Sequence, residues 1–306
     1  MLDKLFKLQE NKTNVRTEVM AGIITFLTMS YILAVNPQIL GETGMDRGAL
    51  FTTTALAAIA GTLFMALIAN VPIAQAPGMG LNNFFAFSVV IAMGHSWQFA
   101  LTGVLLSGVC FMLLTIFNIR KSIVDNIPVA LKNAIPIGIG LFITLIGLNS
   151  AGIVTGNPFT LVQLGDMSNP NVWIAFVGLV VITVLLVKKV HGAILIGIIV
   201  STIFAIFLGK IQLPQGSWVS LPPSIEPIFF KFEWNQILTF DMLIVVFTFL
   251  MVNIFDAMGT LIGVISKIGK SNADGSFPQL QKALFADALG TFVGALLGTS
   301  PNTSYI

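Results

Sequence analysis

The fold of this chain is decided by one stretch, VPIAQAPGMGLNNFF at residues 71–85. It stands where an apolar crossing of a membrane is expected, yet it holds two prolines, two glycines and two asparagines within 15 residues. Proline and glycine interrupt a regular helix, so we expect an extended segment that enters a half-helix near Asn82. Irregular backbone at membrane depth survives only where protein or a wet cavity surrounds it. The stretch therefore predicts a binding cavity inside a membrane domain.

The composition around this stretch is that of a membrane protein. Of 306 residues, 56% are hydrophobic and only 9% are charged, and the mean hydropathy is +0.93. A soluble domain carries about 25% charged residues, so a water-soluble enzyme and a nucleic-acid binder are excluded. One cysteine and two histidines exclude a disulfide framework and a metal cluster. We expect the lipid bilayer as a partner, with no metal, cofactor or nucleic acid.

Apolar stretches long enough to cross a bilayer recur along the whole chain, since a crossing helix needs about 20 residues. Nine of them qualify, and a tenth begins near residue 299: 19–35, 50–69, 74–93, 99–118, 129–148, 172–187, 191–209, 242–265 and 283–298. Placing the N-terminus in the cytosol puts twelve of the fifteen Lys and Arg residues on cytosolic segments, as the positive-inside rule requires. We therefore expect an all-α polytopic protein of about nine and a half spans.

An internal repeat divides these spans. At an offset of 229 residues, Gly61-Thr62 matches Gly290-Thr291 and Pro72 matches Pro301. The repeat unit then holds seven spans, and because seven is odd the second copy enters the membrane from the opposite face. Inverted repeats of this kind are typical of secondary transporters. The expected division is a cytosolic tail at 1–18, the first repeat at 19–209, an external loop at 210–241 and an incomplete second repeat at 242–306.

The second half offers a matching interruption at residues 298–305, which read GTSPNTSY. A pair of Gly/Pro-broken crossings at corresponding places of two repeats is the best sequence indication of a transporter site. A half-helix that begins at such a break presents free N–H groups and a positive dipole end to a polar ligand. The alternative is that both segments are loops at the membrane edge, but their common register favours a site.

Asp256 is the one acidic residue deep inside a predicted span. An ionised Asp at the centre of a crossing helix costs about 2.5–3.5 kcal/mol, so this side chain must face a polar cavity or be protonated. Asp256 is therefore a candidate proton carrier, and it could equally accept hydrogen bonds from the N–H groups of a ligand. The alternative is a buried Asp satisfied by a neighbouring helix.

Other polar and small residues give weaker indications of function. Asp287 lies nearer the cytosol, where we expect capping or gating. It lacks the Gly-x-Gly-Asp element of an intramembrane aspartyl protease, since Leu284-Phe285-Ala286 precede it. His95 and His191 stand at span edges, where we expect them to be solvated. We expect helix-packing contacts at five glycines: Gly22, Gly61, Gly138, Gly140 and Gly294.

Several motifs together resemble the AzgA-like purine permeases of the nucleobase–cation symporter 2 group. They are spread over the whole chain: residues 22–31 with Asn36-Pro37, residues 76–82, Phe255-Asp256 with Gly259-Thr260, residues 273–275 and residues 286–291. The resemblance implies a fold of two inverted seven-helix repeats with short strands in spans 3 and 10. It implies proton-coupled uptake of hypoxanthine, guanine or adenine across the plasma membrane, with a homodimer as one arrangement.

The resemblance also implies the site residues. Asp256 matches the acid of span 8, Asn82 the polar residue of span 3, and Thr303, Ser304 and Tyr305 the strand of span 10. Phe84 or Phe85 could stack on a planar base. The family has a glutamate directly after Ile306, where this sequence stops, so we expect a fragment, an incomplete gene model or a frameshift, and no complete transport cycle from the chain as written. The alternatives are an anion transporter or channel of the same fold, which Asp256 disfavours, and an inert truncated chain.

Overall fold

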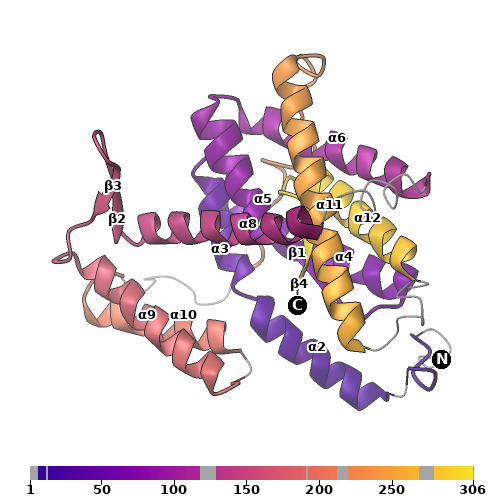
Figure 1. Cartoon of the computed structure of the whole chain (residues 1–306), viewed down its shortest axis with the longest axis horizontal. Coiled ribbons are helices and arrows are strands. Elements are labelled where there is room, and N and C mark those ends of the chain that lie inside the picture. The colour runs from indigo at the N-terminus through magenta and orange to yellow at the C-terminus, as the bar shows by residue number, and fades with distance from the viewer. Residues whose placement is uncertain are drawn as a thin grey trace. The chain divides into compact units, whose positions relative to one another are not determined.

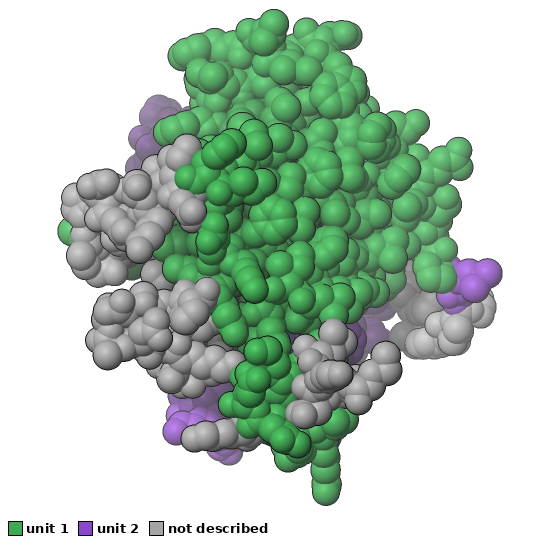
Figure 2. Space-filling view, turned by 90° about the vertical axis from the view of Figure 1, so that its right-hand side faces the viewer, with its two compact units in different colours: residues 1–19, 32–138, 222–306 green, residues 20–31, 139–221 purple. Residues whose placement is uncertain are grey.

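The computed structural model describes residues 6–11, 13–117, 129–190, 192–211, 220–268 and 279–305. The chain forms two compact units, coloured separately in Figure 2. Unit 1 comprises residues 1–19, 32–138 and 222–306, and unit 2 comprises residues 20–31 and 139–221. The units interleave along the chain, whereas the predicted repeats follow one another, and the repeat boundaries stay a prediction.

The elements are almost all helices (Figure 1). Unit 1 holds α3 (Ile32–Gly41), α4 (Arg47–Phe64), the π-helical η1 (Met65–Ala69), β1 (Ala74–Pro77), α5 (Met79–Asn83), the π-helical η2 (Phe84–Ala92), α6 (Trp97–Ile116), α11 (Phe240–Ile268), α12 (Leu280–Leu297) and β4 (Asn302–Tyr305). Unit 2 holds most of α2 (Val15–Met29) and α8 (Val129–Ser150), with β2 (Val154–Asn157), β3 (Leu161–Leu164), α9 (Pro170–Val187) and α10 (Ala193–Phe207).

The predicted crossings coincide with apolar helices. Within the described residues, six helical segments are long and apolar enough to cross a membrane, and three shorter apolar helices fall on the third, fifth and seventh predicted spans. The first crossing, Val15–Gly41, is longer than predicted because only Ser30 and Tyr31 separate α2 from α3. The chain is therefore a multi-pass membrane protein. The β2–β3 hairpin of unit 2 was not predicted.

Unit 1 is layered along its helices. One apolar cluster includes Leu50 of α4 and Phe249 of α11. A second cluster includes Met65, just after α4, and Ile254 of α11. The segment from Leu50 to Met65 spans about 22 Å at 1.5 Å per residue. Several buried polar side chains fall between these two clusters: Thr53 and Thr54 of α4, Ser107 of α6, Asn253 of α11 and Thr291 of α12. A polar layer thus crosses the middle of unit 1.

The two strands enter this polar layer in the same way. The helical run α4–η1 ends at Asn70, which has a left-handed φ of 53°, and Pro72 follows. Helix α12 ends at Gly298, with a φ of 93°, and Pro301 follows. A left-handed residue closes a helix and proline prevents its continuation, so the chain leaves both helices in extended form. These two exits are the matching places that the predicted repeat identifies.

A cover segment, residues 222–239, closes the end of unit 1 at which α4, α6 and α11 begin. Thr52 Oγ1 donates to the carbonyl of Pro223 at 2.9 Å, and the Phe230 amide donates to Leu296 O at 3.2 Å. The Glu233 amide donates to Thr102 Oγ1 at 2.9 Å. The segment is therefore hydrogen-bonded to α4, α6 and α12 before α11 starts.

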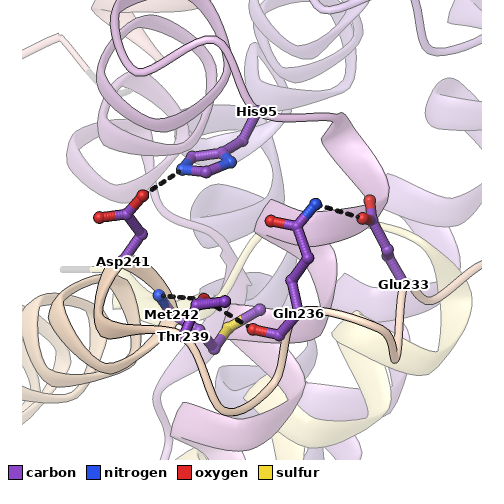
Figure 3. A network of polar contacts seen from close by, with 6 residues as sticks. All are labelled: His95, Glu233, Gln236, Thr239, Asp241 and Met242. Carbon is purple, nitrogen blue, oxygen red and sulfur yellow. Dashed lines mark hydrogen bonds and ion pairs between the residues drawn. The ribbon is translucent and has the colours of Figure 1, made fainter.

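The contact between His95 and Asp241, at the same end of unit 1, corrects one prediction (Figure 3). His95 is not solvated: its side chain is 16% exposed, its ring stacks on Phe99 at 4.0 Å between centroids, and Nε2 lies 3.3 Å from Asp241 Oδ2. Aromatic packing across the loop between η2 and α6 buries the ring. Gln236 Nε2 donates to Glu233 Oε1 at 2.8 Å beside it. His191 lies outside the described residues.

Candidate functional site

The two interrupted segments meet as an antiparallel strand pair in unit 1 (Figure 1). The register sets Ala74 opposite Tyr305, Gln75 opposite Ser304, Ala76 opposite Thr303 and Pro77 opposite Asn302. The Gly78 amide also donates to Pro301 O at 3.0 Å. The strands follow matching helices of the two repeats and run in opposite directions, as an inverted repeat requires. Both strands are buried at the level of the polar layer.

Helix α5 begins at the end of β1. Its N-cap is Gly78, which has extended backbone and makes no side-chain capping bond, and the helical run continues through η2 to Ala92. The predicted half-helix is therefore present, but it starts at Met79, three residues earlier than Asn82. A Cβ on Gly78 would meet Thr303 Oγ1 at 2.6 Å. The close approach of β4 thus requires glycine at this position.

Asn82 lies within a closed network of buried side chains. Its Nδ2 donates to Asn36 Oδ1 at 2.6 Å, and Ser300 Oγ donates to its Oδ1. Asn36 Nδ2 in turn donates to Thr54 Oγ1 at 2.6 Å and to Thr299 Oγ1 at 3.0 Å. The network joins α3, α4, α5 and the segment before β4. Both ends of the Asn82 amide are engaged with protein.

The three predicted residues of β4 do not all point the same way. Successive residues of a strand face opposite sides and directly paired residues share a side, so Ser304 and Gln75 lie on one side and Thr303 and Tyr305 on the other. Tyr305 Oη donates to Pro77 O at 2.8 Å. Ser304 is 6% exposed, and among the described residues its hydroxyl has no hydrogen-bond partner.

Asp256 belongs to a stripe of α11 that runs past the strand pair. Phe249, Asn253 and Asp256 follow at helical spacings of four and three residues, which places them on one face. Asn253 Nδ2 donates to Thr291 Oγ1 at 3.1 Å, and Thr291 Oγ1 donates to the carbonyl of Asn302 at 3.2 Å. Helix α11 packs against β4 and α5. The Asp256 side chain is partly exposed, and within the described part of the chain its carboxyl has no hydrogen bond.

Phe84 packs against the same stripe. Its ring meets Phe249 edge to face, with 5.0 Å between centroids and 82° between planes. Phe85 is fully buried in the core and tilted against Phe249 at 6.5 Å. Of the two rings predicted to stack on a base, Phe84 is therefore the one with partial exposure.

Sequence reasoning missed a third element of this region, the contact of Gln75 with Asp287. Gln75 Nε2 donates to Asp287 Oδ1 at 2.6 Å, and both side chains are fully buried. Asp287 does not cap α12, whose N-cap is Gln279, so the expectation of a capping role is wrong. The matched Gly-Thr pairs of the repeat were the available signal, because Gly61 and Gly290 border Gln75.

A cavity of unit 1 lies away from the strand pair. Among the described residues no group of three His, Cys, Asp or Glu side chains could hold a metal ion. A cavity of about 390 Å³ in unit 1 lies elsewhere, between residues 6–19 and residues 66–72. Its lining includes none of the predicted site residues.

Comparison with known proteins finds relatives that are described as permeases. A family model described as "Permease family" matches residues 16–306. The chain is 44% identical over 306 residues to the adenine permease AdeP of Escherichia coli strain K12, covering all of this chain and 68% of AdeP. It is 43% identical to the guanine/hypoxanthine permease PbuO of Bacillus subtilis strain 168, covering 99% of this chain and 71% of PbuO.

A solved structure gives a likeness of fold. The transmembrane domain of the cyanobacterial bicarbonate transporter BicA aligns with a TM-score of 0.57 and 17% sequence identity, over 92% of this chain and 74% of that one. At this identity the likeness concerns the fold alone.

Proposed function

Because the chain belongs to the permease family matched over residues 16–306, we propose that it takes up a purine nucleobase, adenine or guanine/hypoxanthine, by proton symport across the plasma membrane. The N-terminus lies in the cytoplasm in this proposal. The substrate class follows from the names of the relatives, which are adenine and guanine/hypoxanthine permeases. A permease family indicates a transporter and not an enzyme.

The observation that carries the proposal is the pairing of β1 with β4 beside α11. A purine is a planar ring system whose edges carry both N–H donors and nitrogen acceptors. Strand and half-helix backbone can offer complementary donors and acceptors, as broken crossings do in transporters. The carboxyl of Asp256 accepts N–H groups of the base, and the ring of Phe84 packs on its face.

The remaining predicted residues have distinct parts. Thr303, Ser304 and Tyr305 supply the backbone of β4. Asn82 reaches a base only by giving up its bond to Asn36 or Ser300. It is therefore the proposed ligand with the largest cost of binding. A proton on Asp256 neutralises the loaded site, which permits the transition that releases the base.

The test is uptake of labelled adenine, guanine and hypoxanthine by cells without purine permeases of their own that produce the full-length protein, with bicarbonate and sulfate in parallel. We expect saturable purine uptake that a protonophore abolishes. Asp256→Ala should lower uptake about tenfold to a hundredfold, because it removes hydrogen bonds to a charged group. Asp166→Asn, an exposed carboxyl of unit 2, is the matched control.

The outcomes separate function from site. Uptake of bicarbonate or sulfate without purine would replace the proposal by an anion transporter of the same fold. Purine uptake that is unchanged in Asp256→Ala would leave the function and overturn the assignment of Asp256.

A further inference from the structure

The side chain of Gln75 passes between two helices to reach its partner. Residue 75 lies on β1, and Asp287 lies on α12, one helical turn before Gly290 and Thr291. The bond from Gln75 Nε2 to Asp287 Oδ1 is 2.6 Å long, and neither side chain is exposed. A hydrogen bond to a carboxyl in surroundings without water is among the stronger polar contacts.

Two glycines make room for this passage. A Cβ on Gly61 of α4 would lie 3.0 Å from both Cβ and Oε1 of Gln75, and a Cβ on Gly290 of α12 would lie 2.7 Å from Gln75 Oε1. The same Cβ on Gly290 would lie 3.4 Å from Gly61 Cα. The helices α4 and α12 therefore cross at these glycines, and any larger residue would close the opening that holds the Gln75 side chain.

The fastening is reciprocal between the repeats. Strand β1 follows α4 but is fastened through Gln75 to α12, whereas β4 follows α12 but is fastened to α4, since Asn302 Nδ2 donates to Ala57 O at 2.9 Å. Each strand is also held by its own helix. Thr62 Oγ1 accepts a hydrogen bond from the backbone N–H of Gln75 at 3.0 Å and donates one to the backbone carbonyl of Gln75 at 3.2 Å. Thr291 Oγ1 donates to Asn302 O at 3.2 Å.

We propose that Gln75 and Asp287 are positioning residues of the purine site, which fix the depth and register of β1 against β4 and thereby set affinity and selectivity among purines. The inference rests on the proposed function. Asp287 acts through Gln75 and does not touch the base. Since a carboxylate accepts hydrogen bonds, it directs Nε2 of the amide to α12 and Oε1 to the glycines. A strand displaced by a fraction of an ångström no longer matches the edges of a rigid base.

The experiment exchanges the side-chain amide of Gln75 and the carboxyl of Asp287. Asp287→Asn keeps the shape and an acceptor, so we expect purine affinity about tenfold weaker. Gln75→Glu sets two carboxyls against each other, and we expect a loss of about a hundredfold or more. The double variant Gln75→Glu with Asp287→Asn restores the bond with donor and acceptor reversed. We expect it to recover to within about threefold of Asp287→Asn.

The readouts are KM and maximal rate of uptake, the ratio of adenine to hypoxanthine affinity, and thermal stabilisation of the purified protein by each base. Positioning predicts a changed KM and a changed ratio at similar maximal rate. Asp166→Asn serves again as the control. Because Gln75→Glu could fail to accumulate, the isosteric Asp287→Asn and the double variant are also measured by base-induced stabilisation.

Two results would overturn the inference. The first is a double variant that accumulates but stays as impaired as Gln75→Glu, because the restored hydrogen bond would then not set the position of β1. The second is an unchanged KM and purine ratio in Asp287→Ala. If the unaltered protein takes up no purine, the proposed function fails instead, and the two failures are thus distinguishable.

Discussion

The two units differ in what they bury. Every fully or nearly fully buried polar side chain among the described residues belongs to unit 1, including Asn36, Gln75, Asn82, Asp287 and Asn302. In the described helices of unit 2, hydroxyls donate to carbonyls of their own helix, as Ser201 Oγ does to Gly197 O at 2.9 Å. A membrane helix loses little by such internal bonds, so these hydroxyls need no partner on a neighbouring helix.

The small residues of the units follow the same division. Gly61 and Gly290 admit the polar side chain of Gln75. Gly178 and Gly197 admit Ser201 and the aliphatic Ile182 where α9 packs on α10. Close helix packing through glycine is general in membranes, but among the residues that the structure describes it encloses a buried hydrogen-bond network only in unit 1. Unit 1 therefore holds the buried polar side chains of the described residues, and the proposed site belongs to it.

The largest effect should come from closing the opening at Gly290. The leucine side chain of Gly290→Leu would overlap Gln75 and Gly61. This forces α4 and α12 apart and leaves the buried side-chain amide of Gln75 without its hydrogen bond, at a combined cost of about 3 kcal/mol or more. We expect no purine uptake and little folded protein by thermal denaturation in detergent. Gly140→Leu is the control, since no described atom lies within 4 Å of a Cβ there. Equal loss in both variants would remove the distinction between the units.

A smaller effect is expected from Asn82→Ala. The change leaves the side chains of Asn36 and Ser300 without a partner that they share in the buried network, which costs about 1–3 kcal/mol. Thermal denaturation should show this loss together with a weaker purine affinity. The matched change in unit 2, Ser201→Ala, should alter stability by no more than about 0.5 kcal/mol. A stable Asn82→Ala that only loses affinity would show that Asn82 serves to bind the base and not to stabilise unit 1.

Much of this arrangement was accessible from the sequence. The interruption at residues 71–85, its counterpart at 298–305 and the offset that joins them predicted broken crossings in two inverted repeats. The resemblance to a known family implied short strands there, and the two strands are paired. Each of the nine predicted crossings falls on an apolar helix of the described residues, and six of these helical segments are long enough to cross a membrane. The resemblance to the AzgA-like purine permeases is confirmed by the family match and the permease relatives.

The remainder depends on contacts that no local pattern encodes. Whether Gln75 faces a ligand or a helix is set by its register with Ser304, far along the chain. The depth of Asp287 in the membrane domain depends on how α12 packs against α4. The nearby Lys282 suggested a position closer to the cytosol. Of the five glycines expected to pack, Gly22, Gly138 and Gly140 have no described atom within 4 Å of a Cβ. The sequence of an apolar helix does not show which face of the helix packs against a neighbour. It therefore does not show which glycines make packing contacts.

A third change tests whether unit 2 is indifferent to the chemistry. A Cβ on Gly197 would overlap Ile182 Cγ1 and lie 2.8 Å from Ile182 Cδ1, so α9 must shift to accept it. Gly197→Ala should therefore cost about 1–3 kcal/mol of stability and leave KM and the purine ratio unchanged. Uptake kinetics beside thermal denaturation separate the two quantities. A shifted purine ratio would show that unit 2 also sets selectivity.

The smallest effect is expected at the rim of unit 1, where His95 meets Asp241 (Figure 3). The pair lies in the unit that carries the network, yet the Asp241 side chain is 54% exposed, and water and salt screen the contact. A double-mutant cycle of His95→Gln and Asp241→Asn should give a coupling of about 0.2–1 kcal/mol that falls with added salt. A coupling as large as the loss in Asn82→Ala would mean that membership of unit 1 governs the strength of a polar contact. A small one leaves burial as the cause, because exposure is what separates this pair from Gln75 and Asp287.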